Sequence, residues 1–120
     1  MSTPTGDDNA WMADFLDEFL LEAAELCAAV EERLLNLPKV ALKQRAALQK
    51  AAMGELHNLK GNAGMVGATE GRALAHEMED RLGAIDLENP DIDDLLHDLD
   101  RLRKNFAALS GDEKDQEQTE

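Results

Sequence analysis

Apolar residues return every three or four positions along four stretches of this chain, and this spacing constrains the fold more than any other feature. It places the apolar side chains on one face of a helix. Aromatic residues, which favour strands, make up only 3% of the chain. We therefore predict an all-α protein, an antiparallel up-down-up-down four-helix bundle. The expected helices span about residues 9–37, 40–66, 69–85 and 90–109.

Residues that start or stop helices lie at the ends of these stretches. Residues 7–9, Asp-Asp-Asn, offer an N-terminal cap for the first helix, and Pro38 disfavours helical geometry in the residue before it. Gly67 is expected to end the second helix, and Thr69 to cap the third. The Asn-Pro pair at residues 89–90 predicts a fourth helix with proline at its first position.

The length of the chain fits one domain, and its two ends lack apolar periodicity. We predict a disordered N-terminus over residues 1–8 and a four-helix bundle over residues 9–111. Residues 112–120 are charged and are expected to form an acidic tail or the start of a linker.

The chain is strongly acidic, with 12 Lys and Arg against 26 Asp and Glu and a formal net charge of −14. Such a surface repels nucleic-acid phosphates and anionic lipid, so we expect protein partners, no nucleic acid and no membrane. No apolar run approaches the ~20 residues that span a bilayer, and the N-terminus lacks a signal-peptide pattern. The single cysteine, Cys27, lies next to the apolar stripe and is expected to be a buried or half-buried thiol. We expect a cytoplasmic domain that is monomeric in isolation.

The polar face of the second predicted helix carries an unusual group of residues. At about 100° per residue, four of them share the side opposite the apolar stripe: His57, Lys60, Gly61 and Gly64. Each glycine costs about 1 kcal/mol relative to alanine in a helix interior, but it leaves bare backbone that a partner can approach. A neutral imidazole is a nitrogen nucleophile that is largely unprotonated near neutral pH, which makes His57 a candidate nucleophile.

These residues resemble the motif of histidine-containing phosphotransfer (Hpt) domains, in which His-x-x-Lys-Gly is followed several residues later by a second glycine. His57, Lys60, Gly61 and Gly67 occupy those positions. Gly64 matches the variant that is common in CheA-type chemotaxis histidine kinases. The similarity covers about residues 10–109, and the first predicted helix also resembles the opening helix of CheA-type domains.

The resemblance implies a role for each matching residue. His57 would be the phosphoacceptor, and Lys60 would stabilise the phosphoryl oxygens. Glu79 would hydrogen-bond Nδ1 of His57 and leave Nε2 as the nucleophile, with His76 as a further candidate member of this network. Three glycines would form the surface on which a partner docks: Gly61, Gly64 and Gly67.

Two positions depart from the family pattern. Asn62 stands where a small Ser or Gly is frequent, and its side chain would narrow the approach of a partner. Gly71 stands where a large apolar residue is usual. As a glycine it weakens the third helix, and we expect it to allow a close helix crossing.

The chain contains neither a Gly-rich phosphate loop nor an Asp-rich receiver pattern, so we expect a phosphoryl carrier and not an enzyme with its own ATP site. No cofactor is expected in this chain, because ATP and Mg²⁺ would belong to its partners. The resemblance implies two of them in two-component phosphorelay signalling: a histidine kinase catalytic domain and a response-regulator receiver domain. It leaves open whether the chain is a free-standing protein or the N-terminal part of a CheA-like kinase.

Two other functions are compatible with the sequence. The chain could be a helical-bundle adaptor in which His57 is incidental. It could also bind a metal through His57, His76, Glu79 and His97, although it has neither a His-Glu-x-x-His motif nor paired Glu-x-x-His helices.

Overall fold

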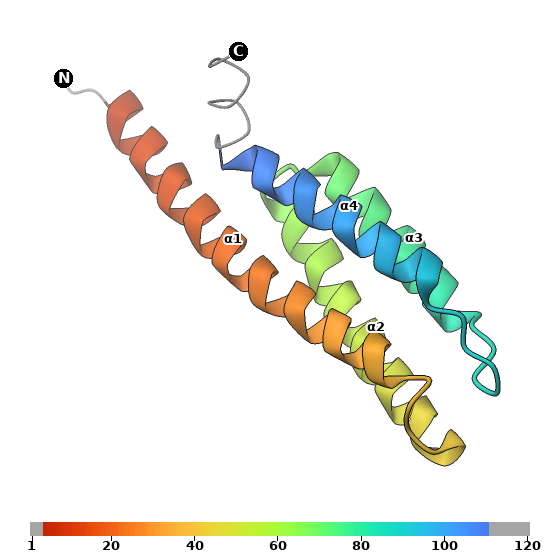
Figure 1. The fold of residues 1–120 in the computed structure, drawn as a ribbon. Coiled ribbons are helices and arrows are strands. Elements are labelled where there is room, and N and C mark those ends of the chain that lie inside the picture. Colours follow the sequence, from red (N-terminus) through yellow and green to blue (C-terminus); the bar gives the residue numbers. More distant parts are fainter. Residues whose placement is uncertain (1–3, 111–120) are drawn as a thin grey trace, which may run out of the picture.

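The computed structural model describes residues 4–110, with side chains from residue 13 onward, and this part of the chain contains four helices and no strand. The helices are α1 (Pro4–Asn36), α2 (Leu42–Met65), α3 (Thr69–Gly83) and α4 (Asp93–Leu109). Successive helices run in opposite directions (Figure 1). Each helix packs against two neighbours, α1 and α3 both lying between α2 and α4. The predicted all-α four-helix bundle is confirmed.

The apolar stripes of the four helices meet in one core. Among its largest fully buried side chains are Val30, Leu34, Leu56, Leu59, Met78, Leu82, Leu95, Leu99 and Leu102. The rings of Phe19 on α1 and Phe106 on α4 meet edge to face with centroids 5.1 Å apart, a favoured aromatic geometry. Cys27 is buried in the same core, as predicted. None of the described helices is long and apolar enough to cross a membrane.

Ion pairs join neighbouring helices at the edge of the core. Arg33 on α1 donates from Nη2 to Oε2 of Glu55 on α2, at 2.8 Å. This hydrogen bond and the carboxylate's charge raise the pKa of Arg33. On the opposite side of the bundle, buried Asp98 on α4 lies 3.2 Å from Nη1 of Arg81 on α3 and 3.4 Å from Nη1 of Arg101. Two guanidinium groups therefore accompany the one charged side chain that is buried among the described residues.

The start of α1 differs from the prediction. The helix begins at Pro4, so the expected N-terminal cap at residues 7–9 is wrong, and α1 includes residues 4–8, where disorder was expected. Proline suits the first helical position, because its φ is already helical and its missing N–H would have no partner there. Residues 1–3 and the predicted tail over residues 112–120 lie outside the described residues.

Gly67 ends α2 as predicted, in a left-handed conformation with φ +76°. The N–H of Gly67 donates to the carbonyl of Gly64 at 3.3 Å, and the N–H of Ala68 donates to that of Ala63 at 2.8 Å. This pair of bonds is a Schellman turn, which closes the helix and satisfies its last carbonyls. The prediction that Thr69 caps α3 is wrong: the turn puts Ala68 at the cap position, and Thr69 is the first residue of the helix.

The connection between α3 and α4 is longer than expected. α3 ends at Gly83, two residues before the expected end, and α4 begins at Asp93 instead of Pro90. Oδ1 of Asp86 accepts the N–H of Glu88 at 3.0 Å, and Oδ1 of Asp91 accepts the N–H of Asp93 at 3.2 Å. Such bonds from aspartate to the backbone compete with helix formation, which is why the helix starts late.

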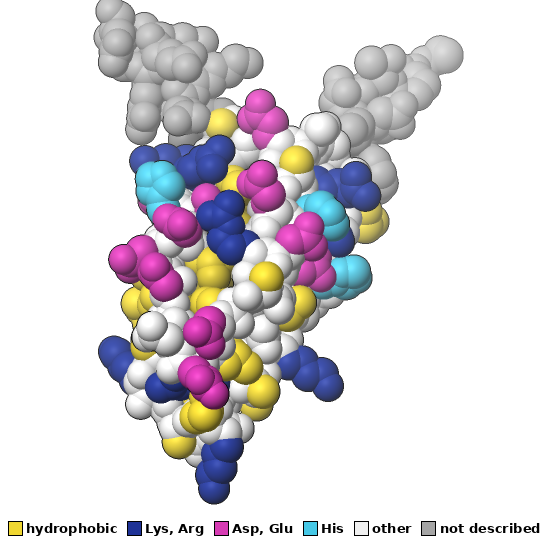
Figure 2. Space-filling model, turned by 90° about the vertical axis from the view of Figure 1, so that its right-hand side faces the viewer, with side chains coloured by type: hydrophobic (Ala, Val, Ile, Leu, Met, Phe, Trp, Pro, Cys, Tyr) yellow, Lys and Arg dark blue, Asp and Glu magenta, His cyan; other side chains and the backbone are white. Residues whose placement is uncertain are grey.

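Arg45 ties two connections together at one end of the bundle. Its guanidinium donates to carbonyls of the α1–α2 connection, Val40 at 3.1 Å and Pro38 at 3.3 Å, and to carbonyls of the α3–α4 connection, Leu87 at 2.8 Å and Glu88 at 3.2 Å. This end is the narrow lower end in Figure 2, where basic side chains project. One side chain thus fixes how the two helix pairs meet.

Gly71 is buried where α3 crosses α4. A Cβ at this position would lie 2.6 Å from Cε1 of Phe106 and 2.8 Å from Oδ1 of Asn105. Real Cβ atoms do not come this close to such neighbours, so only glycine fits without movement. The expected close crossing is confirmed.

Candidate functional site

His57 lies on the face of α2 that points away from the core. Its neighbours Leu56 and Leu59 are fully buried, and the helical repeat then turns the imidazole outward. The side chain is 68% exposed. The prediction that His57 is presented to solvent is confirmed.

Glu79 on α3 lies beside His57. Its Oε2 is 3.4 Å from Nδ1 of the imidazole, and its side chain is only 19% exposed. Buried Met78 and Leu82 set the register of α3 against α2, which places the carboxylate at the boundary between the helices. An N–H···O hydrogen bond usually spans about 2.7–3.2 Å, so a small movement of either side chain completes one. Contacts at such sites are often long before the partner binds.

Lys60, one turn along α2 from His57, contacts the same carboxylate. Its Nζ lies 3.1 Å from Oε1 of Glu79, an oxygen that is buried and lacks a well-directed hydrogen bond. The contact is therefore an ion pair between charges. Nζ also lies 3.3 Å from Nδ1 of His76 on α3. Because the stem of lysine is flexible, the ammonium can turn from Glu79 towards another anion that appears near His57.

His76 meets Lys60 on one side and Asp80 on the other. Its Nε2 lies 3.6 Å from Oδ2 of Asp80, one turn further along α3. The structure thus brings together all four side chains that were predicted to act together, in one continuous set of contacts: His57, Lys60, His76 and Glu79. Asp80 was not predicted, and its spacing of four residues from His76 is the only sequence signal for that contact.

The three predicted docking glycines lie together at the C-terminal end of α2 and in the turn that follows it. Gly61, Gly64 and Gly67 line one hollow of about 440 Å³ with Met65, Thr69 and Arg72. A Cβ at Gly61 would meet no atom within 4 Å, so this glycine faces open space. Asn62 instead lines a separate hollow with Phe15, Phe19 and other residues, on the side of α2 that faces α1. Its side chain therefore does not narrow the face that carries His57.

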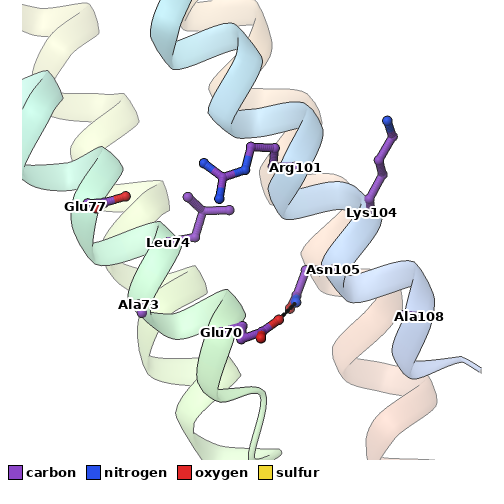
Figure 3. A pocket seen from close by; sticks show the side chains of 8 residues that line it. All are labelled: Glu70, Ala73, Leu74, Glu77, Arg101, Lys104, Asn105 and Ala108. Atoms are coloured by element: carbon purple, nitrogen blue, oxygen red, sulfur yellow. Dashed lines mark hydrogen bonds between the residues drawn. The ribbon is translucent and has the colours of Figure 1, made fainter.

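A larger hollow, with a volume of about 620 Å³, lies elsewhere, between α3 and α4. Figure 3 shows Arg101 reaching from α4 towards Leu74 on α3, and a hydrogen bond of 3.1 Å joining Asn105 to Glu70. Lys104 points away from the hollow in the same view. None of the predicted site residues lines this groove.

His97 lies on α4 and is exposed, without a contact to the other histidines among the described residues. Within residues 4–110, no three or more His, Cys, Asp or Glu side chains are grouped so that they could hold a metal ion. The proposed metal set of His57, His76, Glu79 and His97 therefore does not come together in this part of the chain.

A comparison with protein-family models adds an independent finding. The model of the Hpt domain matches residues 14–105, which include most of the chain and the whole of the site. The chain belongs to the Hpt-domain family. Neither the curated proteins nor the solved structures contain a match to it. As an Hpt domain, the protein is a histidine phosphotransfer module of phosphorelay signalling, and the four-helix bundle agrees with this family.

Proposed function

We propose that His57 accepts a phosphoryl group from a histidine kinase domain or a phosphorylated receiver domain and passes it to an aspartate of a response regulator. The observation that carries this proposal is the exposed imidazole with a carboxylate on its Nδ1 side. A proton held on Nδ1 by Glu79 leaves the lone pair on Nε2, which is the nitrogen that can attack phosphorus.

No other group of this chain forms or breaks a covalent bond when the phosphoryl group moves to His57. The Nε2 lone pair forms a bond to phosphorus, while the bond from phosphorus to the donor's oxygen breaks and its electrons leave with that oxygen. The imidazole then carries a positive charge and keeps its Nδ1 proton beside Glu79. Transfer onwards reverses these bonds: a carboxylate oxygen of the receiver attacks phosphorus, the N–P bond breaks, and neutral His57 returns.

Lys60 neutralises the charge that spreads over the phosphoryl oxygens during this reaction. Its ion pair with Glu79 keeps the ammonium one helical turn from His57 before the phosphoryl group arrives. Because that pair lacks a well-directed hydrogen bond, little is lost when Lys60 turns towards the new anion. His76 supports Lys60 and does not contact the imidazole of His57 in this set.

The partners supply the rest of the chemistry. A kinase domain brings ATP, and a receiver brings the Mg²⁺ site around its aspartate, so the Hpt domain is a carrier and not an enzyme. The residues Gly64, His76 and Glu79 support a CheA-type, chemotactic setting, and the single cysteine suits the reducing cytoplasm. Both a free-standing carrier and the N-terminal domain of a kinase fit this role.

Phosphotransfer profiling tests the proposal. The chain is incubated with a panel of ATP-loaded histidine kinase domains and, separately, with phosphorylated receiver domains. We expect at least one member to label the chain with phosphate that is labile in acid and stable in base, as a phosphohistidine is. An adaptor with an incidental His57 would bind partners without being labelled, and that result would contradict the proposal.

A further inference from the structure

Arg72 is the one arginine without an acceptor in the part of the chain that the structure describes. The chain has six arginines, and the other five donate to or pair with oxygens: Arg33 with Glu55, Arg45 with backbone carbonyls, Arg81 and Arg101 with Asp98, and Arg103 with Glu31. Acidic residues outnumber basic ones 26 to 12. An arginine that stays unpaired in so acidic a chain is available for a partner.

The stem of Arg72 is seated on α2 by Gly64. A Cβ at Gly64 would lie 3.2 Å from Cδ of Arg72 and 3.3 Å from Nε, so the absence of a side chain is what lets the arginine lie this close. Arg72 belongs to the first turn of α3, and its position across the α2–α3 turn follows from the tight closure at Gly67. A side chain whose stem rests on a neighbouring helix loses less freedom when its head group binds.

The space beside this guanidinium is open and partly apolar. Arg72 and Gly64 share the hollow of about 440 Å³ with Met65, whose side chain is 69% exposed. Methionine is flexible and polarizable, so its side chain adapts to the surface of a partner that docks on this hollow. A cation and an exposed methionine on one hollow therefore suit a protein surface that presents a carboxylate next to an apolar residue.

The distance from His57 decides what Arg72 can touch. Seven residues separate His57 from Gly64, which is about 10 Å along the helix axis. Arg72 packs on Gly64, two helical turns from His57, whereas Lys60 is one turn away, so Lys60 is the nearer cation to a phosphoryl group on His57. Arg72 therefore acts on the body of the partner.

We propose that Arg72 anchors the receiver domain by pairing with an acidic side chain of that domain, at a point about 10 Å along α2 from His57, with Met65 packing beside that pair. The planar guanidinium binds a carboxylate through two parallel hydrogen bonds, which fixes orientation as well as position. The inference rests on the proposed function, because it names the residue of the phosphotransfer site that binds an acidic side chain of the receiver domain.

The test measures transfer from phosphorylated His57 to the receiver domain that accepts fastest from a panel, over a range of receiver concentrations. We expect Arg72→Glu to raise the half-saturating receiver concentration at least about tenfold, since like charges at an interface repel. Arg72→Gln should raise it about threefold, as the loss of one exposed pair does. The rate at saturating receiver, and labelling of His57 by a small phosphoramidate donor, should stay as in the wild type.

Lys43→Glu is the matched control, because it makes the same change of charge at an exposed residue of α2 that pairs with no acidic side chain among the described residues. Circular dichroism of each variant verifies the fold. The inference is overturned if Arg72→Glu shifts half-saturation no more than Lys43→Glu does, or if it slows labelling by the small donor, which would place its effect on His57. If the wild-type chain takes no phosphoryl group from any donor, the proposed function itself has failed.

Discussion

Oε2 of Glu79 lies 3.4 Å from Nδ1 of His57, across the boundary between α3 and α2. The contact joins a mostly buried carboxylate to an exposed imidazole, so the two ring nitrogens have different surroundings. Nδ1 faces the protein, which leaves Nε2 to a partner. This asymmetry is what a nucleophile with one productive tautomer requires.

Removal of the Glu79 carboxylate should change both the tautomer of His57 and its reactivity. In Glu79→Ala, the share of the Nδ1–H tautomer, measured by ¹⁵N NMR, should fall towards that of free imidazole. The rate of phosphorylation should fall about a hundredfold, the scale of a positioned acid–base partner. Glu77→Ala is the matched control, because Glu77 lies on the same helix but lines the groove against α4. An unchanged tautomer and rate in Glu79→Ala would remove the orienting role.

Alanine variants of Gly61 and Gly54 distinguish an effect on partner docking from an effect on the stability of α2. Both lie inside α2, and a Cβ at either would meet nothing within 4 Å. Alanine at each position should raise the free energy of unfolding by about 0.5–1 kcal/mol, the difference in helix propensity. Only Gly61→Ala should also slow transfer to a receiver domain, because Gly61, unlike Gly54, lines the hollow that contains the other two docking glycines. Equal transfer rates for both variants would show that Gly61 is not part of the docking surface.

Gly71→Ala should destabilise the bundle despite the better helix propensity of alanine. Its Cβ would press on Cε1 of Phe106 and Oδ1 of Asn105, at 2.6 and 2.8 Å. We expect the free energy of unfolding to fall by about 1–3 kcal/mol, as overpacking of a core usually does. Urea unfolding of Gly71→Ala, of Gly54→Ala and of the wild type measures this change in the free energy of unfolding. A gain in stability like that of Gly54→Ala would mean that α3 and α4 can separate at no cost.

Cys27 should make the stability of the bundle depend on pH in the alkaline range. Burial raises the pKa of the thiol from 9.0 to about 11, and the positive charge of Arg103 opposes this rise. The folded state therefore holds the thiol proton more tightly than the unfolded state. Its contribution is fully present below pH 9 and is lost as the pH rises through 11. We expect the loss to reach about 3 kcal/mol.

Urea unfolding of the wild type and of Cys27→Ala at several pH values isolates this effect from other groups that titrate there. The difference between the two proteins should stay constant up to pH 8.5 and change above pH 9, with the wild type losing more stability. A difference that is constant through pH 11 would show that the thiol ionises in the folded state as easily as in the unfolded one.

The faces of the helices were predictable from the sequence, because burial follows the helical repeat. Leu56 and Leu59 had to point inward, and His57 between them had to point outward. The helix starts were less predictable. Pro4 begins α1, whereas Pro90 does not begin α4, and the difference lies in backbone bonds to the side chains of neighbouring aspartates. Sequence spacing alone does not show whether hydrogen bonds to these aspartate side chains or an extra helical turn is more stable.

Contacts between side chains of different helices could not be predicted from the helical repeat of the sequence. From spacing, Glu79 could equally have been a solvated carboxylate, and only the family resemblance placed it beside His57. Its position depends on how α3 packs against α2, which is set by many core side chains together. The same holds for Arg45, whose four backbone acceptors come from two distant connections. Arg72 likewise had no sequence signal, because its neighbour Gly64 is eight residues away across a turn.

The most direct test of the whole account is phosphate labelling of single histidine variants. The chain has three histidines, and all lie within the described residues. His57→Gln, His76→Gln and His97→Gln are each incubated with the labelling partner and analysed by intact mass at neutral pH. We predict that His57→Gln takes up no phosphoryl group, that His97→Gln is labelled as the wild type is, and that His76→Gln is still labelled. Full labelling of His57→Gln would contradict the account.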